Sequence, residues 1–292
     1  MKGLILCTYN VLERKQDLAA FYEDLFHGRM PAGYLEKKKP IYESFGFTDP
    51  LTDYTRSIAS ALQEEDLQVY IASKHSPPSI ETEVEYALKH GCTTLYILGL
   101  TPFISKTGTV FYEQKVQKTI ERLAPQTKLI SLNGFGQEPK FIELMAKRVF
   151  EAMIHLHHRE PKILFTSHSL PGTEKTNAAF IAQLEHTANE IMKALPKAYE
   201  YRIAYRSLGP KGQKWLGPDI LQVLEEEHAN GTEAVVVCEL LSIIENMEVL
   251  EEIGQAAKEK ALGLGMEFIQ TRYLNNSYDF VDFLKTYLKI NA

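Results

Sequence analysis

The stretch ILFTSHSLP, residues 163–171, joins a short apolar run to a histidine and then to a proline. A bare apolar run of this length is typical of a strand that is buried on both faces in a parallel sheet. Because Pro171 interrupts regular structure, we place His168 at the carboxyl end of the strand. Open α/β sheets bind their ligands at that end. From position alone, a structural and a functional role for His168 both stay open.

Seven other runs repeat this pattern along the chain. The predicted strands are Leu4–Thr8, Gln68–Ser73, Thr94–Leu98, Lys128–Leu132, Ile163–Ser167, Tyr201–Tyr205, Ala234–Cys238 and Glu267–Thr271. The segments with helical periodicity are Pro50–Glu64, Ser79–His90, Val110–Leu123, Pro139–His155, Lys175–Leu195, Asp219–Ala229, Glu248–Ala261 and Tyr278–Leu288. Strands that alternate with helices predict an α/β fold with doubly wound parallel sheets.

The chain divides into two similar parts at the polar segment 155–161, which ends in proline and is typical of a linker. Four predicted strands precede this segment and four follow it. We expect an N-terminal Rossmann-like half over residues 1–158 and a C-terminal Rossmann-like half over residues 159–292. Each half is then a four-stranded parallel sheet flanked by helices, with a ligand cleft between the halves. We expect the last helix to pack back on the first half.

The composition is that of an ordinary globular protein, with 45% hydrophobic and 24% charged residues among 292. The net charge of −6 argues against nucleic acid as a partner and against anionic lipid. No apolar run approaches the roughly 18 residues of a membrane span, so we expect no stable membrane insertion. We also expect a cytoplasmic protein and a monomer. Cys7, Cys92 and Cys238 lie far apart, which predicts reduced core thiols and no iron–sulfur cluster.

Two further strand ends carry polar motifs. The loop RSLGPKGQKWLGPD, residues 206–219, holds the single tryptophan, Trp215, which is either a core anchor or a wall for a flat aromatic ligand. Asp219 suits the N-cap of the next helix, although Pro218 suits its first turn.

The segment ELLSIIENMEVLEE, residues 239–252, places Glu245, Glu248 and Glu252 at spacings of three and four. On a helix they share one face. This face is either an acidic first turn that suits the helix dipole or a carboxylate line for protons or a cation.

These three motifs occur in this order in ferrochelatases, which the chain resembles over nearly its whole length. Agreement in the N-terminal half rests on Gly28-Arg29, Tyr42-Glu43, Pro50-Leu51, Lys74-His75, Pro78 and Ile80-Glu81. The resemblance is to the short bacterial type, similar to coproporphyrin ferrochelatases, without a membrane-binding lip or a cluster-binding tail. It implies a metal-inserting lyase of heme biosynthesis. The implied substrates are ferrous iron and a porphyrin, coproporphyrin III or protoporphyrin IX, with no tightly bound cofactor.

The resemblance also implies roles for single residues. His168 and Glu248 match the catalytic pair, and both, with Glu252, match positions that bind or guide the metal. Ferrous iron accepts imidazole and carboxylate ligands, and a histidine beside a carboxylate is a base near working pH. The implied porphyrin-binding residues are Tyr9, Arg29, Ser105, Tyr112 and Trp215.

Several positions depart from the family pattern. Phe26, His27 and Ile41 stand where basic residues usually hold porphyrin carboxylates, and Asp49, in place of a serine, would repel a propionate. The other departures are Phe103 for a common histidine and Glu245-Asn246 for the usual Asp-His. Two alternatives therefore stay open. One is a non-catalytic tetrapyrrole- or heme-binding relative. The other is a chelatase for another metal, such as cobalt or nickel in a sirohydrochlorin-like ring, for which His75 is the candidate ligand.

Overall fold

The computed structural model describes residues 1–12, 14–44, 46, 49–158, 160–209 and 212–291. Arg159, Pro210, Lys211 and Ala292, which belong to the predicted linker, loop and C-terminal half, lie outside this range. The chain forms two compact units. The first comprises Met1–Gly134 and Asn275–Ala292, and the second comprises Phe135–Leu274.

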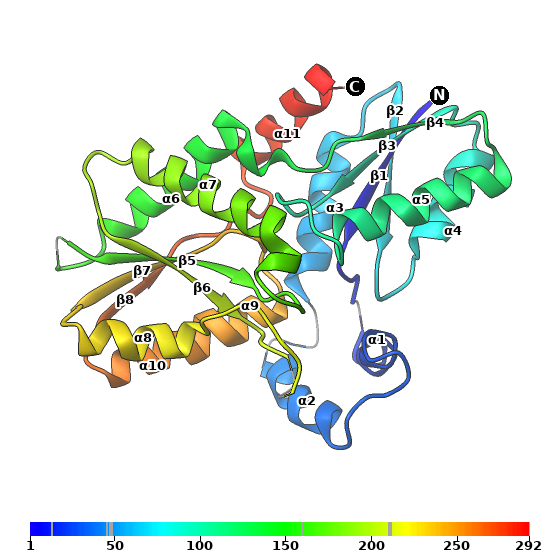
Figure 1. Cartoon of the computed structure of the whole chain (residues 1–292). Coiled ribbons are helices and arrows are strands. Elements are labelled where there is room, and N and C mark those ends of the chain that lie inside the picture. The colour runs from blue at the N-terminus through cyan, green and yellow to red at the C-terminus, as the bar shows by residue number, and fades with distance from the viewer. Residues whose placement is uncertain (13, 45, 47–48, 159, 210–211, 292) are drawn as a thin grey trace. The chain divides into compact units, whose positions relative to one another are not determined.

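The first unit is a four-stranded parallel sheet in the order β2-β1-β3-β4 (Figure 1). Its strands are β1 (Lys2–Thr8), β2 (Leu67–Ser73), β3 (Thr94–Gly99) and β4 (Lys128–Ser131). Its helices are α1 (Asp17–Leu25), α2 (Tyr34–Ser44), α3 (Pro50–Leu62), α4 (Ile80–Lys89), α5 (Thr109–Leu123) and α11 (Tyr278–Asn291). Apolar side chains of β1, β2 and β3 form one core with the inner faces of α4 and α5.

The second unit repeats this plan in a sheet of order β6-β5-β7-β8, again all parallel. Its strands are β5 (Lys162–His168), β6 (Tyr201–Arg206), β7 (Ala234–Glu239) and β8 (Glu267–Gln270). Its helical segments are η1 (Phe135–Gln137), α6 (Pro139–Met153), η2 (Lys175–Asn177), α7 (Ala178–Ala194), α8 (Ile220–Ala229), α9 (Met247–Glu251), the π-helical turn η3 (Glu252–Ala257) and α10 (Lys258–Gly263). Helices α6 and α7 cover one face of this sheet, and α8 and α10 cover the other (Figure 1).

All eight predicted strands are present, with each end within two residues of its predicted position. The predicted α/β fold, with two parallel four-stranded sheets flanked by helices, is confirmed. The prediction succeeded because the central strands are buried on both faces, so their sequences are continuous apolar runs.

Helices α1 and α2 were not predicted. In α2 a single residue, Tyr42, is buried, and Pro40 lies inside the helix, so its periodicity is weak. The predicted helix Glu248–Ala261 is divided into α9, η3 and α10. None of the helices in the described residues combines the length and apolar character that a membrane crossing requires.

The compact units have different bounds from the predicted halves. Residues 135–158 belong to the second unit because α6 packs against α7, β7 and β8. The chain leaves the first unit at Gly134, whose φ of +91° suits glycine. The last helix, α11, contacts α3 in the first unit. Just before α11, Asn276 Nδ2 donates to Ser57 Oγ of α3 at 2.8 Å.

Candidate functional site

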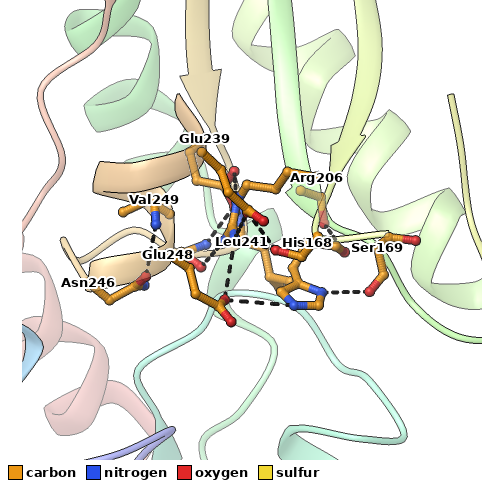
Figure 2. A network of polar contacts seen from close by, with 12 residues as sticks. His168, Ser169, Arg206, Glu239, Leu241, Asn246, Glu248 and Val249 are labelled. Carbon is orange, nitrogen blue, oxygen red and sulfur yellow. Dashed lines mark hydrogen bonds and ion pairs between the residues drawn. The ribbon is translucent and has the colours of Figure 1, made fainter. Parts of the chain in front are cut away.

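Three neighbouring strands of the second sheet each end in a polar side chain. Strand β5 ends at His168, β6 at Arg206 and β7 at Glu239. Since the strands are parallel and β5 lies between the other two, these side chains meet at one edge of the sheet. The segment after β7 adds Glu248 and Glu252. We call these five residues the strand-end cluster. Figure 2 labels His168, Arg206, Glu239 and Glu248 among them.

His168 presents one ring nitrogen to the other members of the cluster. Its Nδ1 lies 2.6 Å from the carbonyl oxygen of Ser169. Because a carbonyl oxygen only accepts hydrogen bonds, Nδ1 carries the proton of the neutral ring and Nε2 carries the lone pair. Nε2 lies 3.7 Å from Glu248 Oε2, just beyond hydrogen-bond distance (Figure 2). The side chains of His168 and Glu248 are 30% and 37% exposed, so both are accessible to a ligand.

The two glutamates are placed by a helix start and a π-helical turn. The Asn246 side chain caps α9 by accepting from the Val249 backbone N–H at 3.1 Å. Glu248 therefore lies in the first turn, and Glu252 is the first residue of η3. The prediction that Glu245 shares their helical face is wrong, because the helix begins only at Met247.

Arg206 was not identified as a site residue from the sequence, yet it lies at the centre of the cluster. Its side chain is 1% exposed. Its Nη1 lies 3.1 Å from Glu252 Oε2 and 3.5 Å from Glu248 Oε2, and its Nε lies 3.1 Å from Glu239 Oε2. Burial lowers the pKa of Arg206, but the carboxylates of Glu239, Glu252 and Glu248 more than offset this and raise its pKa above the ordinary value.

Glu239 anchors Arg206 to the sheet. Its side chain is also 1% exposed, and its Oε2 accepts from the Thr166 hydroxyl at 2.7 Å. Its Oε1 accepts from the backbone N–H groups of Leu241 and Ser242 at 3.2 and 2.9 Å. These bonds satisfy a buried carboxylate that would otherwise be costly.

The first unit holds a second polar group, next to Tyr9. His75 is buried, and its Nδ1 lies 2.7 Å from Asp24 Oδ2. The rings of Tyr9 and His75 meet edge to face, with their centroids 4.8 Å apart. Burial lowers the pKa of His75, and the hydrogen bond to Asp24 acts in the opposite direction. Nothing in the sequence pairs Asp24 with His75, since they lie 51 residues apart.

The other residues predicted to bind porphyrin occupy different environments. Arg29 is exposed in the turn after α1. Ser105 is buried in the loop before α5. Tyr112 is only 5% exposed and packs in the core of the first unit, where burial raises its pKa. Tyr9 is half-buried at the end of β1.

Trp215 lies in the second unit, against the backbone of Gly209. A Cβ atom at position 209 would come within 1.9 Å of Trp215 Cζ2, so only glycine permits this contact. The half-buried indole lines a cavity of about 650 Å³, together with Gly172, Thr173, Glu174, Lys175, Leu208, Gly209, Gln213 and Lys214. Its Nε1 is buried without a hydrogen-bond partner in the described part of the chain.

Two of the departures from the family pattern have local structural roles. Asp49 is 1% exposed and caps α3, accepting from Leu51 N–H at 3.0 Å and lying 3.3 Å from Asn10 Nδ2. The carboxylate of Asp49 therefore faces the N-terminus of α3, and the expectation that it repels a propionate stays a prediction. Phe26 packs edge to face on Tyr34, with the ring centroids 4.8 Å apart.

Asp219 caps α8, as expected, by accepting a hydrogen bond from the Leu221 N–H at 2.8 Å.

Within the described residues, no group of three or more His, Cys, Asp or Glu side chains is arranged to hold a metal ion. His168 and Glu248 together present one imidazole and one carboxylate, which are ligand types that ferrous iron accepts. Among the described residues, the thiols of Cys7, Cys92 and Cys238 are buried and form no disulfide.

The sequence model of the family described as Ferrochelatase matches residues 10–291. The chain belongs to the ferrochelatase family. It is 30% identical to the "Ferrochelatase" of Herpetosiphon aurantiacus, with 97% of each chain covered. It is 28% identical to "Coproporphyrin III ferrochelatase 2" of Bacillus cereus, covering 97% of this chain and 92% of that one.

Solved structures agree on the fold of this ferrochelatase-family chain. "SirB from Bacillus subtilis with Fe3+" superposes with a TM-score of 0.59 at 13% identity, covering 100% of this chain and 95% of that chain. CbiX, described as the terminal enzyme for biosynthesis of siroheme in denitrifying bacteria, superposes with a TM-score of 0.56 at 9% identity, covering 100% of this chain and 99% of that chain. At these identities the likeness supports the chelatase-like fold alone.

Proposed function

We propose that this protein inserts ferrous iron into a porphyrin, with coproporphyrin III as the preferred ring, in heme biosynthesis. The observation that carries the proposal is the placement of His168 Nε2 opposite Glu248 Oε2, 3.7 Å apart, at the carboxyl edge of the second sheet. Family membership supports the reaction, and the names of the Bacillus and Staphylococcus relatives support the ring. We propose that the protein acts in the cytoplasm as a monomer.

His168 and Glu248 can accept the protons that the ring must lose. Insertion of a divalent metal releases two pyrrole protons, so a base has to stand at the ring. With Nδ1 held by the Ser169 carbonyl, Nε2 is the proton-accepting atom of His168. The imidazolium that forms is stabilised by the Glu248 carboxylate beside it. Burial raises the pKa of Glu252, which favours this carboxylate as the next proton acceptor.

The charge of the strand-end cluster suits a dication. One guanidinium and three carboxylates give it a net charge of −2 when His168 is neutral. A negative site at a sheet edge attracts a divalent metal and disfavours anions. The same charge disfavours the ring's own carboxylates at this position, so we propose that these bind elsewhere. Tyr9, Arg29, Ser105, Tyr112 and Trp215 remain the predicted porphyrin contacts.

An anaerobic titration with coproporphyrin III, followed in the Soret region, tests the proposal. Ferrous iron is then added, and insertion is timed against a protein-free control. Binding with accelerated insertion is the expected result. Binding without acceleration favours a tetrapyrrole carrier. Faster insertion of cobalt than of iron, or no binding of coproporphyrin, favours a chelatase for another metal or ring.

A further inference from the structure

We propose that Arg206 is a positioning residue that holds Glu248 and Glu252 in place and competes with the metal for them. The metal is thereby passed on to the ring instead of being retained. This inference rests on the proposed function, because it names a device within the same site. It concerns a side chain that touches neither the ring nor the metal in the proposed mechanism.

The geometry joins Arg206 to the catalytic pair through one oxygen atom. Glu248 Oε2 lies 3.5 Å from Arg206 Nη1 and 3.7 Å from His168 Nε2. The same Nη1 lies 3.1 Å from Glu252 Oε2, which also accepts from the Ser207 hydroxyl. A single guanidinium nitrogen therefore sets the positions of both carboxylates.

The rest of the guanidinium is anchored to the sheet. Strands β6 and β7 flank β5, so Arg206 reaches across the end of β5 to bind Glu239 through Nε. Nη2 donates to Ser242 Oγ at 2.7 Å. Because the planar fork is fixed at Nε and Nη2, Nη1 has one direction in which to point. Burial of the arginine and of Glu239, each 1% exposed, excludes water that would loosen this arrangement.

The charge of Arg206 limits how tightly the two carboxylates can hold a dication. A metal bound at Glu248 would lie about 5 Å from the guanidinium, where repulsion weakens binding about tenfold even at the dielectric constant of water. The metal must also displace the hydrogen bonds that Nη1 makes. A site that attracts a dication but does not retain it suits a protein that must deliver the metal to a ring.

The test compares three variants of the full chain with wild type. Arg206→Gln combined with Glu239→Gln removes both buried charges at once, so that neither is left unpaired. Arg206→Lys keeps a positive charge but loses the planar guanidinium with its fixed N–H donors. Arg202→Gln is the matched control, because Arg202 lies on the same strand and pairs with Glu226 and Glu227 instead. Thermal unfolding reports whether each variant is folded.

Two readouts are taken: Co²⁺ affinity by calorimetry without porphyrin, and kcat and KM for the metal in insertion. The double variant is expected to bind Co²⁺ more tightly, because the metal no longer has to displace the hydrogen bonds from Nη1 to Glu248 and Glu252. Its kcat is expected to fall about tenfold, since hydrogen bonds to charged groups contribute on that order. Arg206→Lys is expected to keep Co²⁺ affinity within about twofold while kcat falls. Arg202→Gln is expected to leave both readouts unchanged.

Unchanged or weaker Co²⁺ binding by the folded double variant overturns the inference. If the double variant does not fold, a wild-type kcat for Arg206→Lys overturns it. Failure of the proposed function looks different: wild type then inserts no metal, while the change in Co²⁺ affinity persists. If wild type inserts iron and all variants match it in both readouts, the proposed function stands and the role of Arg206 is refuted.

Discussion

Replacing His168 with alanine removes the proposed proton acceptor while leaving the strand that carries it. The imidazole of His168 makes one hydrogen bond to the backbone, from Nδ1 to the Ser169 carbonyl oxygen, and the side chain is 30% exposed. Its loss should lower the free energy of unfolding by about 1 kcal/mol. A positioned general base contributes roughly 10²- to 10⁴-fold to a rate, so insertion should fall by at least about 100-fold. The change in activity therefore far exceeds the change in stability.

The assay is anaerobic insertion of ferrous iron into coproporphyrin III, with thermal unfolding measured on the same samples. His90→Ala is the control, because His90 Nδ1 also bonds a backbone carbonyl, that of Tyr86, at 2.8 Å on an exposed helix end. This control should match His168→Ala in stability and wild type in activity. Full activity in His168→Ala would remove His168 from its assigned role. An unfolded variant would show that the histidine is structural.

Three further outcomes are expected. The lowered pKa of His75 means that the unfolded chain binds a proton more readily than the folded chain, so the free energy of unfolding should fall as the pH drops below about 6.5. In denaturant titrations, the free energy of unfolding of His75→Gln should fall less between pH 7.5 and 5.5 than that of wild type. An equal fall in both proteins would contradict this prediction. Asp49→Ala should destabilise the protein by about 1–2 kcal/mol, whereas Asp49→Asn keeps the cap and most of the stability. Gly209→Ala should displace the Trp215 indole, shifting its fluorescence and costing about 1–3 kcal/mol, and an unchanged emission spectrum would refute the close contact.

The strand-end cluster shows how far sequence reasoning reaches into this site. His168 could be placed at a strand end because an apolar run leads directly to it and a proline follows. Its pairing with Glu248, 80 residues later, came from the family resemblance, since no local pattern joins two side chains at that separation. The split of the predicted helix into α9 and η3 also had no sequence signal, because a π-helical turn keeps an ordinary helical composition.

The sequence by itself determined the two parallel sheets and the position of His168, because a strand that is buried on both faces has a continuous apolar sequence. Only the tertiary structure decided which strand ends meet. The order β6-β5-β7 brings Arg206 and Glu239 together across β5. The order of strands along the sequence does not specify which strands are neighbours in the sheet. The same holds for Asp24 beside His75 and for α11 on α3. These contacts depend on how whole elements pack, which periodicity within one element cannot specify.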